Sequence, residues 1–207
     1  ALVRQSYSDP VATYQTNAIG TLNLLEALRA LKKKCTAVLI TSDKCYDNVE
    51  WEWGYRETDT LGGKDVYSGS KGAAELIIKA YLNSFFVDDH VVGIGVGRAG
   101  NVIGGGDWAR DRIVVDCVLA WNEGRGVTLR SPHATRPWQH VLEPLSGYLT
   151  LARALRQRPG LHGEPFNFGP KSSEHHTVQE LVEHMAKYWD KARLQHVSDK
   201  DYAPHES

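Results

Sequence analysis

The sequence is poor in cysteine and methionine and contains no long hydrophobic run. Its three cysteines, Cys35, Cys45 and Cys117, are an odd number without the paired spacing of a zinc site, which argues against a disulfide framework and a cysteine-ligated metal. Free thiols in a reducing, cytoplasmic compartment are the simplest expectation. No apolar run approaches the roughly 18 residues that a membrane-spanning helix needs.

The chain also lacks an excess of either charge. Lys and Arg number 24 and Asp and Glu 25, so the net charge of −1 favours neither nucleic acid nor an anionic membrane as a partner. The only methionine is Met185, and the opening ALVRQSYSDP lacks the charged and apolar blocks of a signal peptide. We therefore expect the 207 residues to be a piece of a longer protein, enough for one large domain or one and a half.

The apolar positions alternate between helical and strand spacing. Ser8-Asp9-Pro10 is typical of a helix start, and Thr177-Val-Gln-Glu180 is a capping-box pattern. The spacing predicts helices over 11–31, 68–86, 111–122, 142–157 and 178–189, and strands over 36–42, 90–100, 126–130 and 164–169. This alternation predicts an α/β sheet with connections on both faces.

Two residues in the stretch YSGSK, Tyr67 and Lys71, lie four positions apart on a predicted helix and so share one face. A phenol has a pKa of about 10, and a nearby ammonium favours the phenolate and lowers that pKa. Such a pair can act as a general base near neutral pH. The spacing alone is a weak signal, because Tyr and Lys four residues apart also recur as surface pairs.

The apolar run that ends at Ile40 is followed directly by Thr41, Ser42, Asp43 and Lys44. In open α/β sheets, ligands bind beyond the carboxyl ends of the strands, so these polar side chains are placed to meet a ligand. A strand-end hydroxyl followed by Tyr-x-x-x-Lys at the head of the next long helix is much more specific than either feature alone. The alternative is a capped strand edge with solvated charges.

Together these motifs resemble those of the extended short-chain dehydrogenase/reductase family, and within it the nucleotide-sugar 4,6-dehydratases. The stretch YQTNAIGTLNLLEA resembles the family's helix with an asparagine before Gly-Thr, and TSDKCY resembles the triplet of the CDP-glucose branch, where the dTDP-glucose branch has Thr-Asp-Glu. RAGNVIGGGDWARDR (98–112) and RPWQHVLEPLSGYL (136–149) resemble the same branch. The resemblance covers nearly the whole chain and implies a Rossmann-type doubly wound parallel sheet with a small C-terminal substrate-binding lobe.

A division of the chain is implied as well. Residues 1–105 are expected to belong to an NAD-binding Rossmann domain, and residues 106–207 mainly to a nucleotide-sugar lobe with returning Rossmann segments. By the same resemblance, the family's N-terminal strand and Gly-rich dinucleotide loop are not in the sequence, and we expect that its C-terminal end is not in it either. Gly93-x-Gly95-x-Gly97 is no substitute, because it lies inside a strand pattern and no helix opens after it. The choice between NAD and NADP stays open, because the acidic residue that reads the ribose belongs to the absent segment.

The resemblance implies NAD-dependent 4,6-dehydration of a nucleotide-linked hexose, with CDP-glucose as the expected substrate. Oxidation at C4 precedes loss of water across C5 and C6, and a hydride then returns to C6. Tyr67 is the expected base at the 4-hydroxyl, and Ser42 is expected to hydrogen-bond the C4 oxygen. Asp43 is the expected acid for the departing 6-hydroxyl, which requires a raised pKa. Lys44 stands where the dTDP branch has a glutamate base, and a cationic role that stabilises an enolate is its alternative.

For the cofactor, the resemblance implies Tyr67, Lys71 and Asn17, although structural support of its helix is an equal interpretation of Asn17. Arginine forks suit a pyrophosphate, so the substrate-binding candidates are Asn101, Arg112 and Arg136. Weaker candidates are Arg98, Arg130 and His140. No metal is expected.

Two alternatives stay open. The first is another dehydratase of the same family, for a dTDP- or GDP-sugar, or a 4-epimerase, although Asp43-Lys44 after Ser42 argues against an epimerase. The second is a non-catalytic fragment whose helices, 10–31 and 68–86, form a four-helix dimer interface. A homodimer or a dimer of dimers is expected, with Ala73, Ala74 and Ile77 as candidates for an outward apolar face. The resemblance also implies a role in deoxysugar synthesis, such as that of lipopolysaccharide O-antigen.

Overall fold

The structure, a computed structural model, describes residues 2–87, 91–109, 111–129, 131–171, 174 and 176–196. The chain divides into two compact units. We name Ala1–Gly100 with Leu142–Gly169 unit 1, and Asn101–Val141 with Pro170–Ser207 unit 2. None of the helices in the described ranges has the length and apolar character that crossing a bilayer requires.

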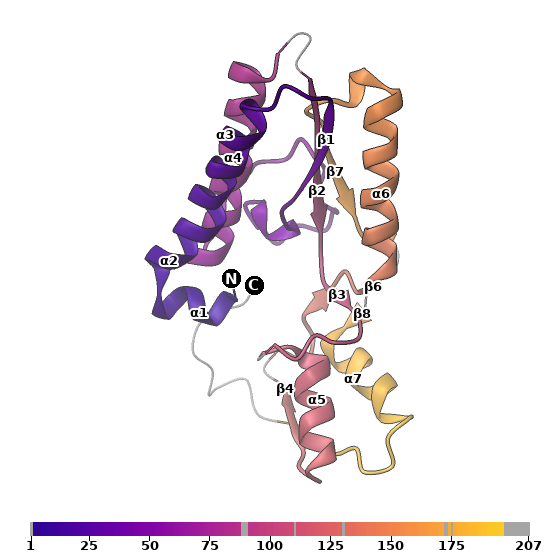
Figure 1. The fold of residues 1–207 in the computed structure, drawn as a ribbon. Helices are drawn as coiled ribbons and strands as arrows, with labels where there is room; N and C mark the ends of the chain where they lie inside the picture. The colour runs from indigo at the N-terminus through magenta and orange to yellow at the C-terminus, as the bar shows by residue number, and fades with distance from the viewer. Residues whose placement is uncertain are drawn as a thin grey trace. The chain divides into compact units, whose positions relative to one another are not determined.

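Unit 1 is built on a parallel sheet with helices on both faces. Its strands, in the order β1-β2-β7, are β1 (Cys35–Ile40), β2 (Val92–Ala99) and β7 (Pro165–Phe168). Figure 1 shows α3 (Gly20–Arg29) and α4 (Val66–Phe85) on one side of this sheet and α6 (Leu142–Gln157) on the other. The predicted α/β sheet with connections on both faces is therefore confirmed.

The helix predicted over 11–31 is present as one helical run from Pro10 to Arg29 that contains a π-helical turn. A short helix, α1 (Val3–Ser8), comes first, and Asp9 then caps α2 (Pro10–Tyr14) by accepting a hydrogen bond from the Ala12 N–H. A π-helical turn, Gln15–Ile19, then joins α2 to α3 without a break. Such turns insert one extra residue into a helix and are invisible to a search for 3.6-residue spacing.

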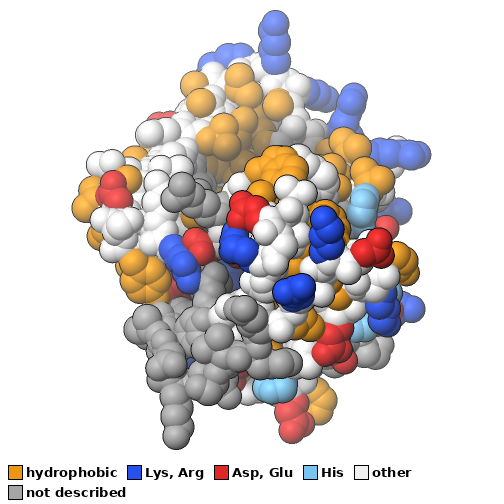
Figure 2. Space-filling model, turned by 90° about the horizontal axis from the view of Figure 1, so that it is seen from below, with side chains coloured by type: hydrophobic (Ala, Val, Ile, Leu, Met, Phe, Trp, Pro, Cys, Tyr) orange, Lys and Arg blue, Asp and Glu red, His pale blue; other side chains and the backbone are white. Residues whose placement is uncertain are grey.

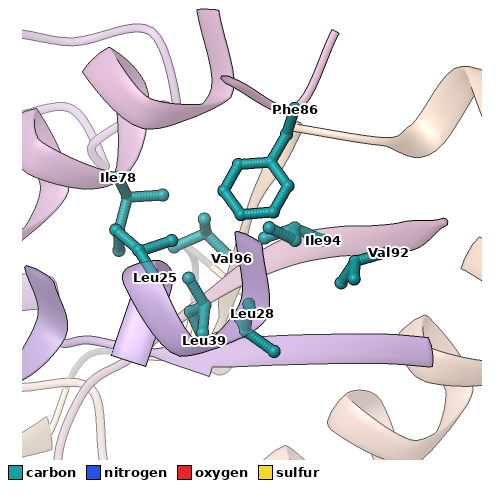
Figure 3. Packing of buried hydrophobic residues seen from close by; sticks show 8 residues of the cluster. All are labelled: Leu25, Leu28, Leu39, Ile78, Phe86, Val92, Ile94 and Val96. Atoms are coloured by element: carbon teal, nitrogen blue, oxygen red, sulfur yellow. The ribbon is translucent and has the colours of Figure 1, made fainter. Parts of the chain in front are cut away.

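The core of unit 1 lies between α3, α4 and the sheet. Eight buried residues converge there from both helices, the segment after α4 and two strands (Figure 3): Leu25, Leu28, Leu39, Ile78, Phe86, Val92, Ile94 and Val96. Burying one such side chain fully contributes about 1.5–3 kcal/mol. This core fixes α4 against the strands and so fixes the face of α4 that carries Tyr67 and Lys71.

On the opposite face of the sheet, α6 packs close to β2 because glycines leave room for it. A Cβ on Gly95 would lie 2.9 Å from Leu155 Cδ1, and one on Gly97 would lie 2.8 Å from Tyr148 Cε1. The interpretation of Gly93-x-Gly95-x-Gly97 as part of a strand is confirmed, since all three lie in β2. These glycines serve helix–sheet packing.

Unit 2 has a second, smaller core. Helices α5 (Ile113–Asn122) and α7 (Val178–Ala186) pack with the parallel pair β4 (Val127–Leu129) and β9 (Leu194–His196). The capping box predicted at Thr177 is present, with Thr177 and Glu180 exchanging hydrogen bonds. The other strands are pairs of two residues each: β3 (Val102–Ile103) with β6 (Gln139–His140), and β5 (Thr135–Arg136) with β8 (His176–Thr177). The sequence did not predict them, because two residues show no period.

Candidate active site

The polar stretch after β1 forms a tight turn. Thr41 still donates its N–H to Gly97 O of β2, and Ser42 then caps a 3₁₀ helix, Asp43–Cys45. Ser42 Oγ accepts from the Lys44 N–H at 3.2 Å and donates to Asp43 Oδ1 at 2.9 Å. The side chains of Ser42, Asp43 and Lys44 are half-buried. Three consecutive residues are thus held in one short turn at the carboxyl end of a parallel strand.

Helix α4 begins beside this turn. Asp65 caps α4 by accepting from the Ser68 N–H at 3.0 Å, which places Tyr67 and Lys71 in the first turns of the helix. The 3₁₀ helix that carries Asp43 and Lys44 contacts α4. Lys71 Nζ lies 5.8 Å from the centroid of the Tyr67 ring, and both side chains are half-buried. The structure therefore places the turn that carries Ser42, Asp43 and Lys44 against the helix that carries Tyr67 and Lys71.

Burial changes the acidity of Lys71. Desolvation lowers the pKa of its ammonium group, and the neighbouring Cys45 and Glu75 oppose this shift only in part. Burial also raises the pKa of the Cys45 thiol to about 12, so that this thiol is uncharged at physiological pH. The lowering moves the pKa of Lys71 from its usual value towards that of a phenol, about 10.

Asn17 is tied to the same helix. In the π-helical turn, Asn17 Nδ2 donates to Ser70 Oγ at 2.9 Å, and Ser70 Oγ donates to the Tyr67 carbonyl at 2.6 Å. Ser70 is fully buried. The Asn17 side chain thus supports the backbone of α4 between Tyr67 and Lys71, which agrees with the structural interpretation of this residue.

A loop packs against the start of α4 through glycines. A Cβ on Gly72 would lie 2.5 Å from Gly62 O, and one on Gly63, whose φ is 149°, would lie 2.3 Å from Gly69 N. The loop is closed at its base by Tyr46 and Leu61, which form an isolated bridge. No side chain fits between the loop and the helix, so the glycines in YSGSKG keep the loop next to Tyr67.

Beneath the turn lies a buried ion pair that the sequence did not single out. Arg98 donates to Glu75 through Nε at 2.9 Å and Nη2 at 2.7 Å, and the two side chains are 4% and 3% exposed. Burial alone would lower the pKa of the guanidinium, but the hydrogen bonds and charge of Glu75 outweigh it and raise that pKa. The weak prediction of Arg98 as a substrate ligand is therefore wrong, because its donors are already used inside the protein.

The predicted substrate residues lie in unit 2. The Asn101 carbonyl accepts from the Gln139 N–H at 3.0 Å, which holds the start of β3 against β6. Arg112 is exposed, with its Nε 3.5 Å from Asp107 Oδ2. Arg136 donates through Nη1 to the Thr135 carbonyl at 2.8 Å. Of the weaker candidates, His140 is exposed on β6, and Arg130 lies outside the described residues.

The donor set in unit 1 fits part of a dinucleotide. A phenol and an ammonium group one helical turn apart, both half-buried beside a strand end, suit the two hydroxyls of a ribose. Among the described residues, no three His, Cys, Asp or Glu side chains are grouped so that they could hold a metal ion.

Comparisons with known proteins show the family of the chain. The sequence profile of the family described as GDP-mannose 4,6 dehydratase matches residues 1–206. A CDP-glucose 4,6-dehydratase from Salmonella typhimurium is 47% identical over an alignment of 211 positions, which covers 100% of this chain and 58% of that protein. The chain therefore spans about 58% of the length of this curated relative.

Two solved structures show the fold. A UDP-glucuronic acid 4-epimerase from Bacillus cereus, in complex with UDP-glucuronic acid and NAD, superposes with a TM-score of 0.79 at 20% identity, over 95% of this chain and 59% of that one. A dTDP-glucose 4,6-dehydratase from Streptomyces venezuelae, with NAD bound, gives 0.74 at 19% identity, over 95% and 58%. The Rossmann-type fold is thus confirmed, and the chain belongs to the GDP-mannose 4,6 dehydratase family of extended short-chain dehydrogenases/reductases.

Proposed function

We propose that the full-length protein is an NAD-dependent nucleotide-sugar 4,6-dehydratase that converts CDP-glucose to CDP-4-keto-6-deoxyglucose. The observation that carries the proposal is the 47% identity, over the whole chain, to a CDP-glucose 4,6-dehydratase. The grouping of Ser42, Asp43 and Lys44 with Tyr67 and Lys71 supports it, because dehydration needs an acid beside the base that serves oxidation.

The resemblance to the family implies a role for each residue. Tyr67 takes the proton of the sugar 4-hydroxyl, and Lys71 stabilises its phenolate and holds the nicotinamide ribose. Ser42 hydrogen-bonds the C4 oxygen. NAD, when bound, supplies the acceptor for the C4 hydride and its later donor to C6. Asn17 keeps the backbone between Tyr67 and Lys71 in place through Ser70.

Water loss falls to the two remaining side chains. Asp43 protonates the departing 6-hydroxyl, and its hydrogen bond from Ser42 Oγ fixes the direction of its carboxyl group. Lys44 either removes the C5 proton as a neutral amine or stabilises the enolate as a cation. Asn101, Arg112 and Arg136 bind the nucleotide, with the arginines at the pyrophosphate.

The test is incubation of the full-length protein with NAD and, separately, CDP-, dTDP-, UDP- and GDP-linked glucose, followed by mass spectrometry. Loss of one water from CDP-glucose alone supports the proposal. An epimer of unchanged mass would identify a 4-epimerase instead. Tyr67→Phe should lower turnover about 100-fold or more, because it removes the base. Tyr188→Phe, at a 78% exposed tyrosine on the segment after α7, is the matched control.

We also propose that the protein is a homodimer or a dimer of dimers. Hydrophobic side chains are exposed at the surface (Figure 2). Several large ones belong to the α2–α3 segment and α4: Val11, Ile19, Leu24 and Leu76. The expected outward residues Ala74 and Ile77 instead face the core of unit 1, because Ala74 is 2% exposed and Ile77 packs against buried residues.

Sedimentation equilibrium of the full-length protein tests the dimer. Leu76→Glu, at a side chain 56% exposed on α4, should weaken the association because it places a charge in the apolar interface. Leu149→Glu, at a side chain 74% exposed on α6, is the matched control. A monomeric wild type would end the proposal. With the dehydratase activity we also propose a cytoplasmic location, which the free cysteines support. A role in O-antigen deoxysugar synthesis is proposed from the likeness to the CDP-glucose 4,6-dehydratase.

A further inference from the structure

One buried carboxylate connects three segments of unit 1. Glu75 accepts two hydrogen bonds from Arg98 of β2 and a third from the hydroxyl of Thr41, at the end of β1. Glu75 itself belongs to α4, one turn beyond Lys71 and two turns beyond Tyr67, on the face that those residues share. The Glu75 carboxylate therefore links the end of β1 and strand β2 to α4, the helix that carries Tyr67.

Arg98 extends this connection to the far side of the turn. Its Nη1 donates to Tyr46 Oη at 2.8 Å and to the Glu57 carbonyl at 2.9 Å. Tyr46 Oη in turn donates to Asn167 Oδ1 of β7 at 2.7 Å. The stretch from Thr41 to Tyr46 is thus held at both ends by the same ion pair, with Ser42, Asp43 and Lys44 between the two attachments.

Stability alone gives no reason for such an arrangement. Burying a charged pair costs desolvation that its mutual attraction often does no more than repay, so apolar residues of similar volume would serve a core as well. Charged hydrogen bonds do provide direction, because the guanidinium and the carboxylate fit each other in one plane. A directional pair fixes the register of the turn against α4, which an apolar contact would leave looser.

We propose that Glu75 is a positioning residue that, through Thr41 and Arg98, sets Ser42, Asp43 and Lys44 against Tyr67 and Lys71. The effect on catalysis rests on the proposed function. The hydrogen bonds that hold the turn do not depend on it. Proton transfer and hydride transfer both need closely placed reacting atoms, and a misplacement of about 1 Å can lower the rate by about 100-fold.

Removing the Thr41 hydroxyl breaks the hydrogen bond that holds one end of the turn to Glu75. Thr41→Val keeps the shape and the Glu75–Arg98 pair but removes the donor to Glu75. Thr41→Ser, the matched control, keeps the donor and removes the methyl group. We expect Thr41→Val to lower kcat about 10-fold or more with KM changed less than about two-fold, and Thr41→Ser to stay near wild type. Equal kcat values in the two variants, or losses that follow the melting temperature, would refute the proposal.

Hydrogen exchange of the turn gives a readout that needs no activity. The amides of Lys44, Cys45 and Tyr46 donate to Ser42 Oγ, Ser42 O and Asp43 O, so their exchange reports how firmly the turn is held. In the full-length protein, exchange in residues 42–46 should be about 10-fold faster in Thr41→Val than in Thr41→Ser. Equal exchange would overturn the positioning role.

The two readouts separate the two proposals. If the wild type dehydrates no nucleotide sugar but exchange responds to the Thr41 hydroxyl, the proposed function fails and the positioning of the turn stands. If the wild type dehydrates CDP-glucose and neither kcat nor exchange responds, only the positioning role fails.

Discussion

Six of the buried side chains in unit 1 are polar or charged, whereas the buried side chains described in unit 2 are apolar. The six are Ser6, Thr13, Ser68, Ser70, Glu75 and Arg98. Four of them lie on α4 or contact Glu75, next to Tyr67 and Lys71. The buried residues of unit 2, by contrast, come from α5, β4 and α7 and surround Trp121.

This difference bears on how firmly each unit can orient its polar side chains. Buried polar groups need fixed partners, so a polar interior orients the groups that line it. In unit 1 the candidate catalytic residues stand directly on such an interior. In unit 2 the core only supports the surface, and Arg112, a candidate for the nucleotide, is 54% exposed.

The largest effect should come from breaking the ion pair of unit 1. Arg98→Met leaves the Glu75 carboxylate buried without its partner, which costs about 3–5 kcal/mol of unfolding free energy. Urea unfolding of the full-length protein measures this loss. The double variant Arg98→Met with Glu75→Leu should recover most of the stability, because no uncompensated charge remains.

Activity of the same double variant sharpens the comparison. Recovered stability with kcat still low would agree with a positioning role for the pair, since the Thr41 hydroxyl has then lost its acceptor. Full recovery of both would show that the polar interior of unit 1 is interchangeable with an apolar one, like that of unit 2.

The features that the sequence predicted are local. Helix α6 was predicted with its observed bounds, Leu142–Gln157, because its apolar spacing and the Pro159-Gly160 stop both lie in one stretch. Tyr67 and Lys71 were found for the same reason, being one helical turn apart. The Asn17–Ser70 and Arg98–Glu75 contacts were not, because they join residues 53 and 23 positions apart. Glu75 offered one faint signal: an acid on the buried face of an amphipathic helix.

His162 illustrates the same limit of sequence reasoning. Its Nδ1 accepts from the Ile94 N–H at 3.1 Å, and its Nε2 lies 2.9 Å from the Phe86 carbonyl. The ring therefore provides a hydrogen-bond partner for β2 just before β7 begins at Pro165. Position in the sequence gives no hint of this, because 68 residues separate His162 from Ile94. Tertiary packing brings these two distant positions together, and no local pattern indicates it.

A smaller effect is expected from the apolar core of unit 2. Val182→Ala removes two methyl groups from a fully buried side chain on α7 and should lower the unfolding free energy by about 1–2 kcal/mol. No second substitution should recover this loss by charge removal, in contrast with Arg98→Met. Leu119→Ala, at a side chain 46% exposed on α5, is the control for urea unfolding. A loss as large as that of Arg98→Met would contradict the contrast between the two interiors.

The smallest effect concerns the buried thiols, one in each unit. Burial raises the pKa of Cys117 from 9.0 to about 12, with a further contribution from Asp116. The folded protein then keeps its proton where the unfolded chain has lost it, so stability from this group is present below pH 9 and declines as the pH rises from 9 towards 12. Between pH 8 and pH 10 the loss is about 1 kcal/mol.

Cys45 should show the same slope in spite of its charged surroundings. Burial raises its pKa to about 12 as well, because the charges of Glu75 and Arg98 act in opposite directions. Urea unfolding at the two pH values, under reducing conditions, should therefore show a pH-dependent loss that is about 1 kcal/mol smaller in either Cys45→Ala or Cys117→Ala than in the wild type. Cys35→Ala, at an exposed thiol, is the control. If only Cys117→Ala changed the slope, the ion pair of unit 1 would be acting on Cys45 as a net positive charge, and its two members would not be balanced.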